Sequence, residues 1–271
     1  MGKGCAMNSA RRTGTHPVGR WNPVRVFVSI SLVVLFLTCG KVGAQADDEY
    51  RVARESMVRI QIAGSLFGRT SVTDEAVLEA MRTVPRHKFV PPAVAGIAYA
   101  DRPLPIGHAQ TISQPYIVAY MTEALRPGPG DTVLEVGTGS GYQAAVLGEI
   151  VAEVYTIEIV PELGEAAGAL LHKLGYENVH VRVGDGYLGW PEHAPFDGII
   201  VTAAPDHIPQ PLIDQLKPGG RLVIPVGPEH QTQTLMVLEK QRDGSVTREE
   251  KMLVRFVPLT GDAHRKKSIQ R

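Results

Sequence analysis

The feature that most constrains the fold is a regular alternation of short β-branched runs with helix-like stretches after Gly130. Each helix-like stretch opens at a glycine or proline, and this alternation specifies a parallel sheet covered by helices on both faces. The runs that we predict as its strands are 132–137, 154–159, 179–185, 196–204 and 221–227. Two further runs, 234–240 and 251–259, are joined through Asp243-Gly244 and predict an antiparallel hairpin. We therefore predict an α/β chain with a mostly parallel sheet and a C-terminal antiparallel hairpin.

The residues before the sheet predict a helical N-terminal part over 50–125. Apolar positions at helical spacing between Tyr50 and Pro92 predict two helices, the second capped by Ser71 or Thr73. Prolines and glycines between 96 and 113 predict an irregular segment, and such segments in compact domains often have a function. A further helix is expected over 115–125. We expect one domain over 47–271, with the helical part at 50–125 and the α/β core at 130–260.

Residues 1–46 have the order of a secretory signal. Basic residues up to Arg25 precede an uncharged apolar run over 26–39, and Ala44-Gln45-Ala46 follows as a small-x-small cleavage site. The run has 14 residues, which is short for a membrane span of about 20. We expect a signal peptide cleaved after Ala46. An uncleaved membrane anchor and a buried helix of the fold are the alternatives.

Charge and cysteine content exclude several functions. The chain has 28 Lys and Arg and 28 Asp and Glu, but residues 1–46 hold six of the basic residues and no acid. The remainder is therefore acidic by about six charges, and we expect no nucleic-acid partner, because phosphate binding needs a basic face. Both cysteines, Cys5 and Cys39, also lie in 1–46. Residues 47–271 can form no disulfide, thiolate zinc site or cysteine nucleophile.

A glycine-rich turn directly follows the first predicted strand and opens a helix. Glycines at such a turn let the backbone approach a ligand closely and direct helix N-terminal amides at it. Gly137, Gly139 and Gly141 give the spacing G-x-G-x-G with Glu135 two residues earlier, whereas the dinucleotide fingerprint is G-x-G-x-x-G. The spacing resembles the cofactor loop of S-adenosylmethionine methyltransferases. A tight strand-to-helix turn without a ligand is the alternative.

Two acidic residues end the next predicted strands. Glu158 lies 21 residues after Gly137, and its carboxylate could accept hydrogen bonds from both hydroxyls of a ribose. Asp185-Gly186 closes the third strand and could face an adenine. Taken alone, Glu158 would more often be a surface acid. The carboxyl ends of parallel strands meet at one edge, where open α/β sheets bind ligands, so we expect these residues to share one site.

The stretch GDGYLGWPEHAPFD over 184–197 is the most specific motif of the chain, and further informative blocks lie at 84–91, 103–121, 133–147 and 254–261. Through these blocks the sequence resembles, from 57 to 261, the protein-L-isoaspartate (D-aspartate) O-methyltransferases, and 184–197 matches the signature of that family. The resemblance implies a Rossmann-like class I methyltransferase fold that uses S-adenosylmethionine and no metal.

The resemblance also implies roles for individual residues. Ser113 matches the active-site serine of the family, although without the resemblance a turn serine beside Pro115 would be preferred. The positions that match cofactor-binding residues are Gly137 and Gly139 in the loop, Glu158 at the ribose, Asp185 and Gly186 at the adenine, and Thr260 near the cofactor.

The implied reaction fits the absence of a general-base constellation in the sequence. A carboxylate acceptor is already ionised at neutral pH, so the enzyme has only to align it with the methyl group and to exclude water. We expect Ser113 to donate a hydrogen bond to the acceptor while residues 105–114 cover the site. The resemblance implies that the methyl ester of an isoaspartyl residue collapses to a succinimide, which reopens partly to normal aspartate. Because isoaspartate adds a methylene to the backbone, we expect recognition of main-chain shape in many peptides and proteins.

Alternative functions remain open at this point. One is a methyltransferase of the same fold acting on a small molecule or another protein carboxylate, and another is a non-catalytic protein that binds damaged chains after export. A nicotinamide oxidoreductase is disfavoured by the glycine spacing. His108, His193, His207 and the tail 264–267 are interpreted as solvated surface.

The leader and the family resemblance lead to different expectations for cellular location. The leader predicts export to the periplasm or outside, with membrane contact only through an uncleaved N-terminal segment. The resemblance instead implies a cytoplasmic monomer, and Met57 would be the start if the assigned start codon were incorrect.

Overall fold

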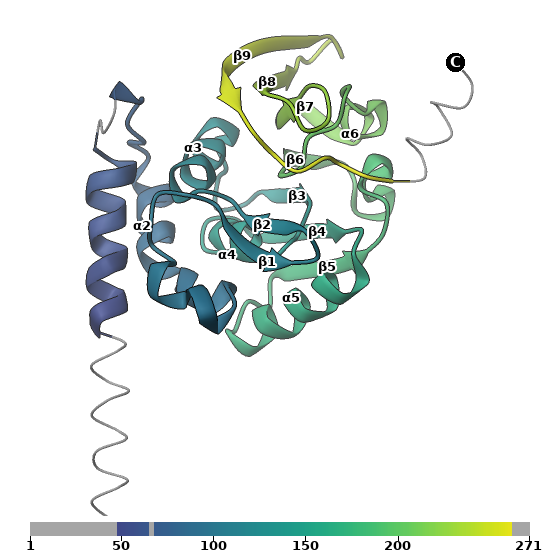
Figure 1. The fold of residues 1–271 in the computed structure, drawn as a ribbon. Coiled ribbons are helices and arrows are strands. Elements are labelled where there is room, and N and C mark those ends of the chain that lie inside the picture. The colour runs from purple at the N-terminus through teal and green to yellow at the C-terminus, as the bar shows by residue number, and fades with distance from the viewer. Residues whose placement is uncertain (1–47, 65–67, 262–271) are drawn as a thin grey trace, which may run out of the picture. The chain divides into compact units, whose positions relative to one another are not determined.

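The computed structural model describes residues 48–64 and 68–261 (Figure 1). The described residues from Glu49 to Gly261 belong to one compact unit. The predicted leader over 1–46, with both cysteines, and the tail over 264–267 lie outside the described residues. Within the described ranges, no helix combines the length and apolar character needed to cross a membrane.

The sheet is mostly parallel, as predicted. Across the described residues it has seven strands in the order β5-β4-β3-β6-β7-β8-β9. The first five in this order pair in parallel, and β8 and β9 add as an antiparallel hairpin. The strand bounds are β3 Thr132–Val136, β4 Glu153–Glu158, β5 Val179–Val183, β6 Phe196–Val201, β7 Leu216–Val226, β8 Gln233–Lys240 and β9 Val246–Val254. Strand order reverses at β3, so the crevice beside its carboxyl end is the expected ligand site of such a sheet.

Helices cover both faces of the sheet, because alternate residues of each strand point to opposite sides. In β3, Val133 belongs to a core shared with α3, α4 and α5, while Leu134 belongs to the opposite core with α6 and η5 (Figure 1). The bounds are α3 Pro115–Leu125, α4 Tyr142–Gly148, α5 Pro161–Lys173, α6 Gln210–Asp214, η5 Gly186–Leu188 and η6 Pro191–His193. The predicted fold class is therefore confirmed.

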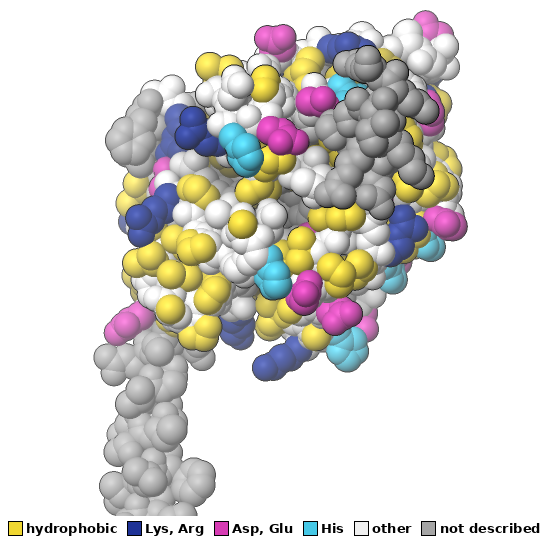
Figure 2. Space-filling view, turned by 45° about the vertical axis from the view of Figure 1, so that its right-hand side comes forward, with side chains coloured by type: hydrophobic (Ala, Val, Ile, Leu, Met, Phe, Trp, Pro, Cys, Tyr) yellow, Lys and Arg dark blue, Asp and Glu magenta, His cyan; other side chains and the backbone are white. Residues whose placement is uncertain are grey.

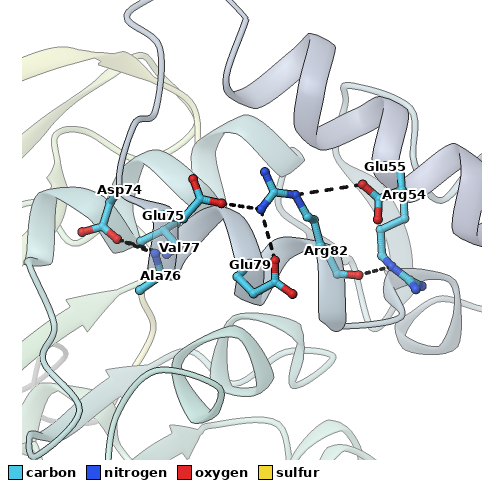
Figure 3. A network of polar contacts seen from close by, with 8 residues as sticks. All are labelled: Arg54, Glu55, Asp74, Glu75, Ala76, Val77, Glu79 and Arg82. Carbon is cyan, nitrogen blue, oxygen red and sulfur yellow. Dashed lines mark hydrogen bonds and ion pairs between the residues drawn. The ribbon is translucent and has the colours of Figure 1, made fainter.

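The N-terminal part contains the two helices predicted from its periodicity. Residues 48–56 are α-helical and continue as the π-helix η1 Met57–Ile62, and α2 Glu75–Thr83 follows. The predicted cap of α2 was wrong. Asp74 is the N-cap, and its Oδ1 accepts hydrogen bonds from the N–H groups of Ala76 and Val77 at 2.9 and 3.2 Å (Figure 3). The N–H and Oγ1 of Thr73 bond instead to Glu123 of α3.

The prediction of an irregular segment over 96–113 was wrong in its second half. After η3 Arg86–Phe89 and η4 Pro92–Ile97, two short strands form an antiparallel hairpin, β1 Leu104–Gly107 and β2 Gln110–Ile112. His108 and Ala109 connect them with φ values of 50° and 56°. Two left-handed residues suit a tight hairpin turn, but the usual signals for it are Asn-Gly or Asp-Gly. His-Ala gave no such signal.

The last predicted strand was displaced. Strand β9 ends at Val254, and the segment 255–261, here called the crossing segment, leaves the sheet. Ala204 donates its N–H to the Val257 carbonyl at 2.8 Å, and Leu259 donates to the Ala204 carbonyl at 2.9 Å. Pro258 between them has no N–H to continue a ladder. The crossing segment therefore lies beside the carboxyl end of β6.

Figure 2 shows how charged side chains are distributed on one face of the described residues. Among the described residues on the face in Figure 2, acidic and basic side chains are scattered between hydrophobic ones, and no basic patch gathers there.

Candidate active site

A cavity lies at the carboxyl ends of β3, β4 and β6, where the glycine loop leaves β3. The predicted site residues that line it are Ser113, Gly137, Gly139, Glu158, Gly186 and Thr260. They come from the hairpin, the glycine loop, the end of β4, η5 and the crossing segment. The structure brings these separated residues to one edge of the sheet, where the sequence placed the glycine loop, Glu158 and Gly186, and their chemical roles remain predictions.

The glycine loop is fixed by hydrogen bonds to the side chain of Thr202, which follows β6, and to the backbone of β4. Gly137 has a φ of 103°, and a Cβ at this position would clash with Oγ1 of Thr202. That hydroxyl donates to the carbonyls of Gly137 and Val136 at 2.6 and 3.0 Å. On the other side, Gly137 donates its N–H to the Ile157 carbonyl at 2.8 Å. Only glycine satisfies both the backbone conformation and the space at this turn.

Glu158 holds the loop from the adjacent strand. Its side chain is buried, one carboxylate oxygen accepts the N–H of Gly139 at 2.7 Å, and the other accepts the N–H of Val160 at 3.0 Å. A carboxylate has about four lone-pair sites, so these two bonds leave acceptor capacity toward the cavity. Glu158 can therefore orient the loop and still bind hydroxyl groups of a ligand.

Unlike the other predicted site residues, Asp185 is not among the residues that line the cavity. Its carboxylate caps η5 by accepting the N–H of Tyr187 at 3.0 Å, and it packs against Gly261. The neighbouring Gly186 lines the cavity, where a Cβ would clash with Val136. The structure thus assigns Asp185 a supporting contact and leaves the adenine role of this pair as a prediction.

Ser113 stands at the junction of two cavities. It lines the cavity of the glycine loop and also a second one, together with Thr111, Thr202 and Val257. The largest share of the lining of the second cavity comes from the end of β9 and the start of the crossing segment, residues 253–257, and Pro103, Gln114 and Ile117 also line it. Ser113 therefore borders both cavities.

Sequence reasoning assigned no role to Glu135, which also lines the first cavity. It is fully buried, and burial raises the pKa of its carboxyl to about 8, with Glu158 adding to the rise and the Thr156 hydroxyl opposing it. Thr138 donates to Thr156 at 2.7 Å, and Thr156 donates to Glu135 at 2.6 Å. The other carboxyl oxygen has no hydrogen-bond partner among the described residues. The sequence did contain a signal for a role of Glu135, because an acidic residue is rarely buried within an otherwise apolar strand unless it has a partner.

Comparison with known proteins decides the family. The family model described as protein-L-isoaspartate(D-aspartate) O-methyltransferase matches residues 61–264. The chain belongs to this family. As a protein-L-isoaspartate O-methyltransferase, it methylates isoaspartyl residues with S-adenosylmethionine as the methyl donor.

Relatives and solved structures agree with this assignment. The methyltransferase is 56% identical over 238 residues to protein-L-isoaspartate O-methyltransferase 2 of Syntrophobacter fumaroxidans, covering 85% of this chain and 96% of the relative. It is 62% identical over 189 residues to that of Gloeobacter violaceus, covering 70% and 92%.

Two solved structures are similar to the fold of this methyltransferase. A protein-L-isoaspartate O-methyltransferase matches with a TM-score of 0.69 and 29% identity, covering 80% of this chain and 70% of that one. A Plasmodium falciparum protein described as the same kind of enzyme, in complex with S-adenosyl-L-homocysteine, matches with a TM-score of 0.64 and 26% identity, covering 76% and 98%.

No metal centre is apparent in the described part of this methyltransferase. Within residues 48–64 and 68–261, no group of three or more His, Cys, Asp or Glu side chains could hold a metal ion.

Proposed function

We propose that Ser113 positions the free carboxylate of an isoaspartyl residue for methyl transfer from S-adenosylmethionine. The observation that supports this role is the place of Ser113 at the junction of the two cavities. The glycine loop lies in the first cavity, and the second leaves room for a peptide on the other side of the serine. One side chain is then in reach of both reactants.

The residues of the first cavity fit S-adenosylmethionine. The glycine loop lets the backbone approach closely, Glu158 offers carboxylate lone pairs for ribose hydroxyls, and Gly186 leaves space that a side chain would fill. We assign Gly137, Gly139, Glu158, Gly186 and Thr260 to cofactor binding, with Asp185 supporting η5. When bound, S-adenosylmethionine supplies an electrophilic methyl group on a positively charged sulfur.

The protein groups then have two tasks. The acceptor carboxylate is ionised at neutral pH, so Ser113 has only to donate a hydrogen bond that fixes its direction. The β1–β2 hairpin excludes water, because Ile106 on β1 reaches the glycine loop. Its Cδ1 lies 3.5 Å from where a Cβ on Gly139 would be. A drier site favours a reaction in which opposite charges are neutralised.

The second cavity is where we place the peptide. Its lining is mixed, with Leu253 and Val254 of β9, the crossing segment from Arg255 to Val257, and Pro103 and Ile117. Such a surface suits recognition of an extended main chain with little demand on neighbouring side chains. This supports the expected acceptance of many isoaspartyl peptides and proteins.

The decisive experiment follows radiolabelled methyl groups from S-adenosylmethionine into an isoaspartyl peptide and its aspartyl twin. Protein beginning at Asp47 should label only the isoaspartyl peptide, and Ser113→Ala should reduce kcat at least about tenfold. Affinity for S-adenosylhomocysteine, measured by calorimetry, should stay unchanged. Ser245→Ala, in the exposed β8–β9 turn, is the matched control.

Three results would contradict parts of this proposal. Failure to label either peptide, with cofactor binding intact, would favour a small molecule or another protein carboxylate as the acceptor, or a non-catalytic binding role. Equal labelling of both peptides would remove the specificity for isoaspartate. Unchanged kcat in Ser113→Ala would leave the activity and remove the role of the serine.

We propose that the mature enzyme is exported. We also propose that it is a monomer. The order of charges and apolar residues over 1–46 supports export, and the cytoplasmic location typical of the family is the alternative. N-terminal sequencing of the natural protein after cell fractionation should find Asp47 as the first residue outside the cytoplasm. A cytoplasmic protein that begins at Met1 or Met57 would contradict export. Light scattering on the purified enzyme tests the monomer.

A further inference from the structure

Arg86 is a fully buried cation that the reaction described so far does not use. It lies at the start of η3 with 0% exposure. Burial lowers the pKa of its guanidinium, an effect that Tyr142 and Tyr99 partly offset. Among the described residues it forms no ion pair with a carboxylate, and its Nη1 has no hydrogen-bond partner. Burying an arginine without a carboxylate partner normally costs considerable stability.

The donors of Arg86 bond to two carbonyl groups that are far apart in sequence. Nε donates to Ala98 at 2.8 Å, and Nη2 donates to Ser113 at 2.7 Å. The guanidinium also lies 4.8 Å from the ring centroid of Tyr142, the residue that opens α4 directly after the glycine loop. A cation over an aromatic ring is attracted to it, although this recovers only part of the desolvation cost.

The two carbonyls bracket one structural unit. Residues 99–112 between them contain the β1–β2 hairpin, whose Ile106 side chain lies next to the space over Gly139 of the glycine loop. Ala98 precedes this unit and Ser113 ends it. Arg86 therefore joins both ends of the hairpin segment to each other, and its contact with Tyr142 joins them to the helix that carries the glycine loop.

We propose that Arg86 is a positioning residue for methyl transfer, which clamps the base of the β1–β2 hairpin and sets the place of Ser113 relative to the glycine loop. The inference rests on the role proposed above for Ser113. An apolar side chain of similar length could fill the space of Arg86 without the cost of a buried charge. It could not donate hydrogen bonds in two directions, which the rigid fork of a guanidinium does.

The test compares Arg86→Met and Arg86→Lys with the matched control Arg82→Met. Arg82 on α2 pairs through its guanidinium with Glu75, Glu79 and Glu55 (Figure 3). It lines neither cavity. Each full-length variant is assayed at 15 °C for kcat and KM with an isoaspartyl peptide. Affinity for S-adenosylhomocysteine is measured by calorimetry, and amide exchange of residues 104–112 is measured by mass spectrometry.

If Arg86 clamps the base of the hairpin, Arg86→Met should lower kcat at least tenfold and raise the rate of amide exchange in the hairpin at least tenfold. Affinity for S-adenosylhomocysteine should change less than threefold. Arg86→Lys, which can reach only one carbonyl at a time, should fall between the wild type and Arg86→Met in both measurements. Arg82→Met should resemble the wild type in both.

Two results would overturn the proposal. One is an Arg86→Met enzyme with lowered melting temperature but wild-type kcat per folded molecule, because that would make the residue merely structural. The other is unchanged kcat and hairpin exchange in Arg86→Lys, which decides the question if Arg86→Met does not fold. Amide exchange can be measured without turnover. If the wild type failed to methylate the peptide, the proposed function would be refuted, but the exchange data would still test whether Arg86 holds the hairpin.

Discussion

The backbone N–H of Gly139 donates a 2.7 Å hydrogen bond to the carboxylate of Glu158, which joins the glycine loop after β3 to the end of β4. The same carboxylate accepts the N–H of Val160. Glu158 was predicted from sequence as a ligand of the cofactor ribose, and the structure shows that it also shapes the loop. Its effect on cofactor affinity should therefore have two parts, one from the loop and one from the charge.

Glu158→Gln should separate these parts. The amide retains one acceptor oxygen but loses the charge, and hydrogen bonds to charged groups are stronger than neutral ones by about 1 kcal/mol. We expect roughly tenfold weaker binding of S-adenosylhomocysteine by calorimetry, and a larger loss in Glu158→Ala, which leaves the N–H of Gly139 without this acceptor. The control is Glu162→Gln on the exposed side of α5. Wild-type affinity in both Glu158 variants would show that this residue is not part of the cofactor site.

Gly137→Ala should destabilise the enzyme through both backbone strain and a clash. A φ of 103° is unfavourable for any residue with a Cβ and costs about 1–3 kcal/mol, and the new methyl group would meet Oγ1 of Thr202. The melting temperature should fall by roughly 2–10 °C, and binding of S-adenosylhomocysteine should weaken.

A double-mutant cycle with Thr202→Ala isolates the clash. Removing the hydroxyl should make Gly137→Ala less costly by more than about 0.5 kcal/mol, measured by urea unfolding, because the two positions are in direct contact. If the two effects were strictly additive, backbone strain alone would explain why glycine is needed at position 137.

The sequence predicted the sheet and part of the cavity because both depend on local patterns. Alternating β-branched runs place the strands, and parallel strands bring the ends of β3 and β4 to one edge, so Gly137 and Glu158 could be placed together without a structure. Ser113 and Thr260 entered the prediction only through the resemblance to a family. Neither lies on a strand of the parallel sheet, and no periodicity shows where a hairpin or a crossing segment will return.

One error has its physical origin in long-range contacts. The crossing segment reads as a continuation of β9, but its residues pair with Ala204 instead, which lies about fifty positions earlier in the chain. The burial of Arg86 likewise depends on long-range contacts, because its guanidinium donates to the carbonyls of Ala98 and Ser113. Local sequence shows which residues can form such contacts, and only the fold shows which of them do.

Glu135 gives the enzyme a dependence of stability on pH. Its carboxyl has a pKa of about 8 in the folded chain, chiefly because of burial, and 4.5 is the ordinary value. Because the folded state holds the proton more tightly, the contribution of this group is fully present below about pH 4.5 and is lost as pH rises toward 8. In Glu135→Gln the amide still accepts from Thr156 and does not ionise, so this dependence should disappear.

Urea unfolding of the wild type and Glu135→Gln at pH 6 and pH 9 measures the effect, and the difference between the two proteins cancels all other titrating groups. The free energy of unfolding of the wild type relative to Glu135→Gln should fall by about 2–3 kcal/mol between these pH values, since each pKa unit corresponds to about 1.4 kcal/mol. A difference that stays constant with pH would mean that Glu135 ionises at its ordinary pKa and that water reaches it through the cavity. A fall of the expected size would establish that the carboxyl next to the glycine loop is protonated at neutral pH, so that it can donate a hydrogen bond there.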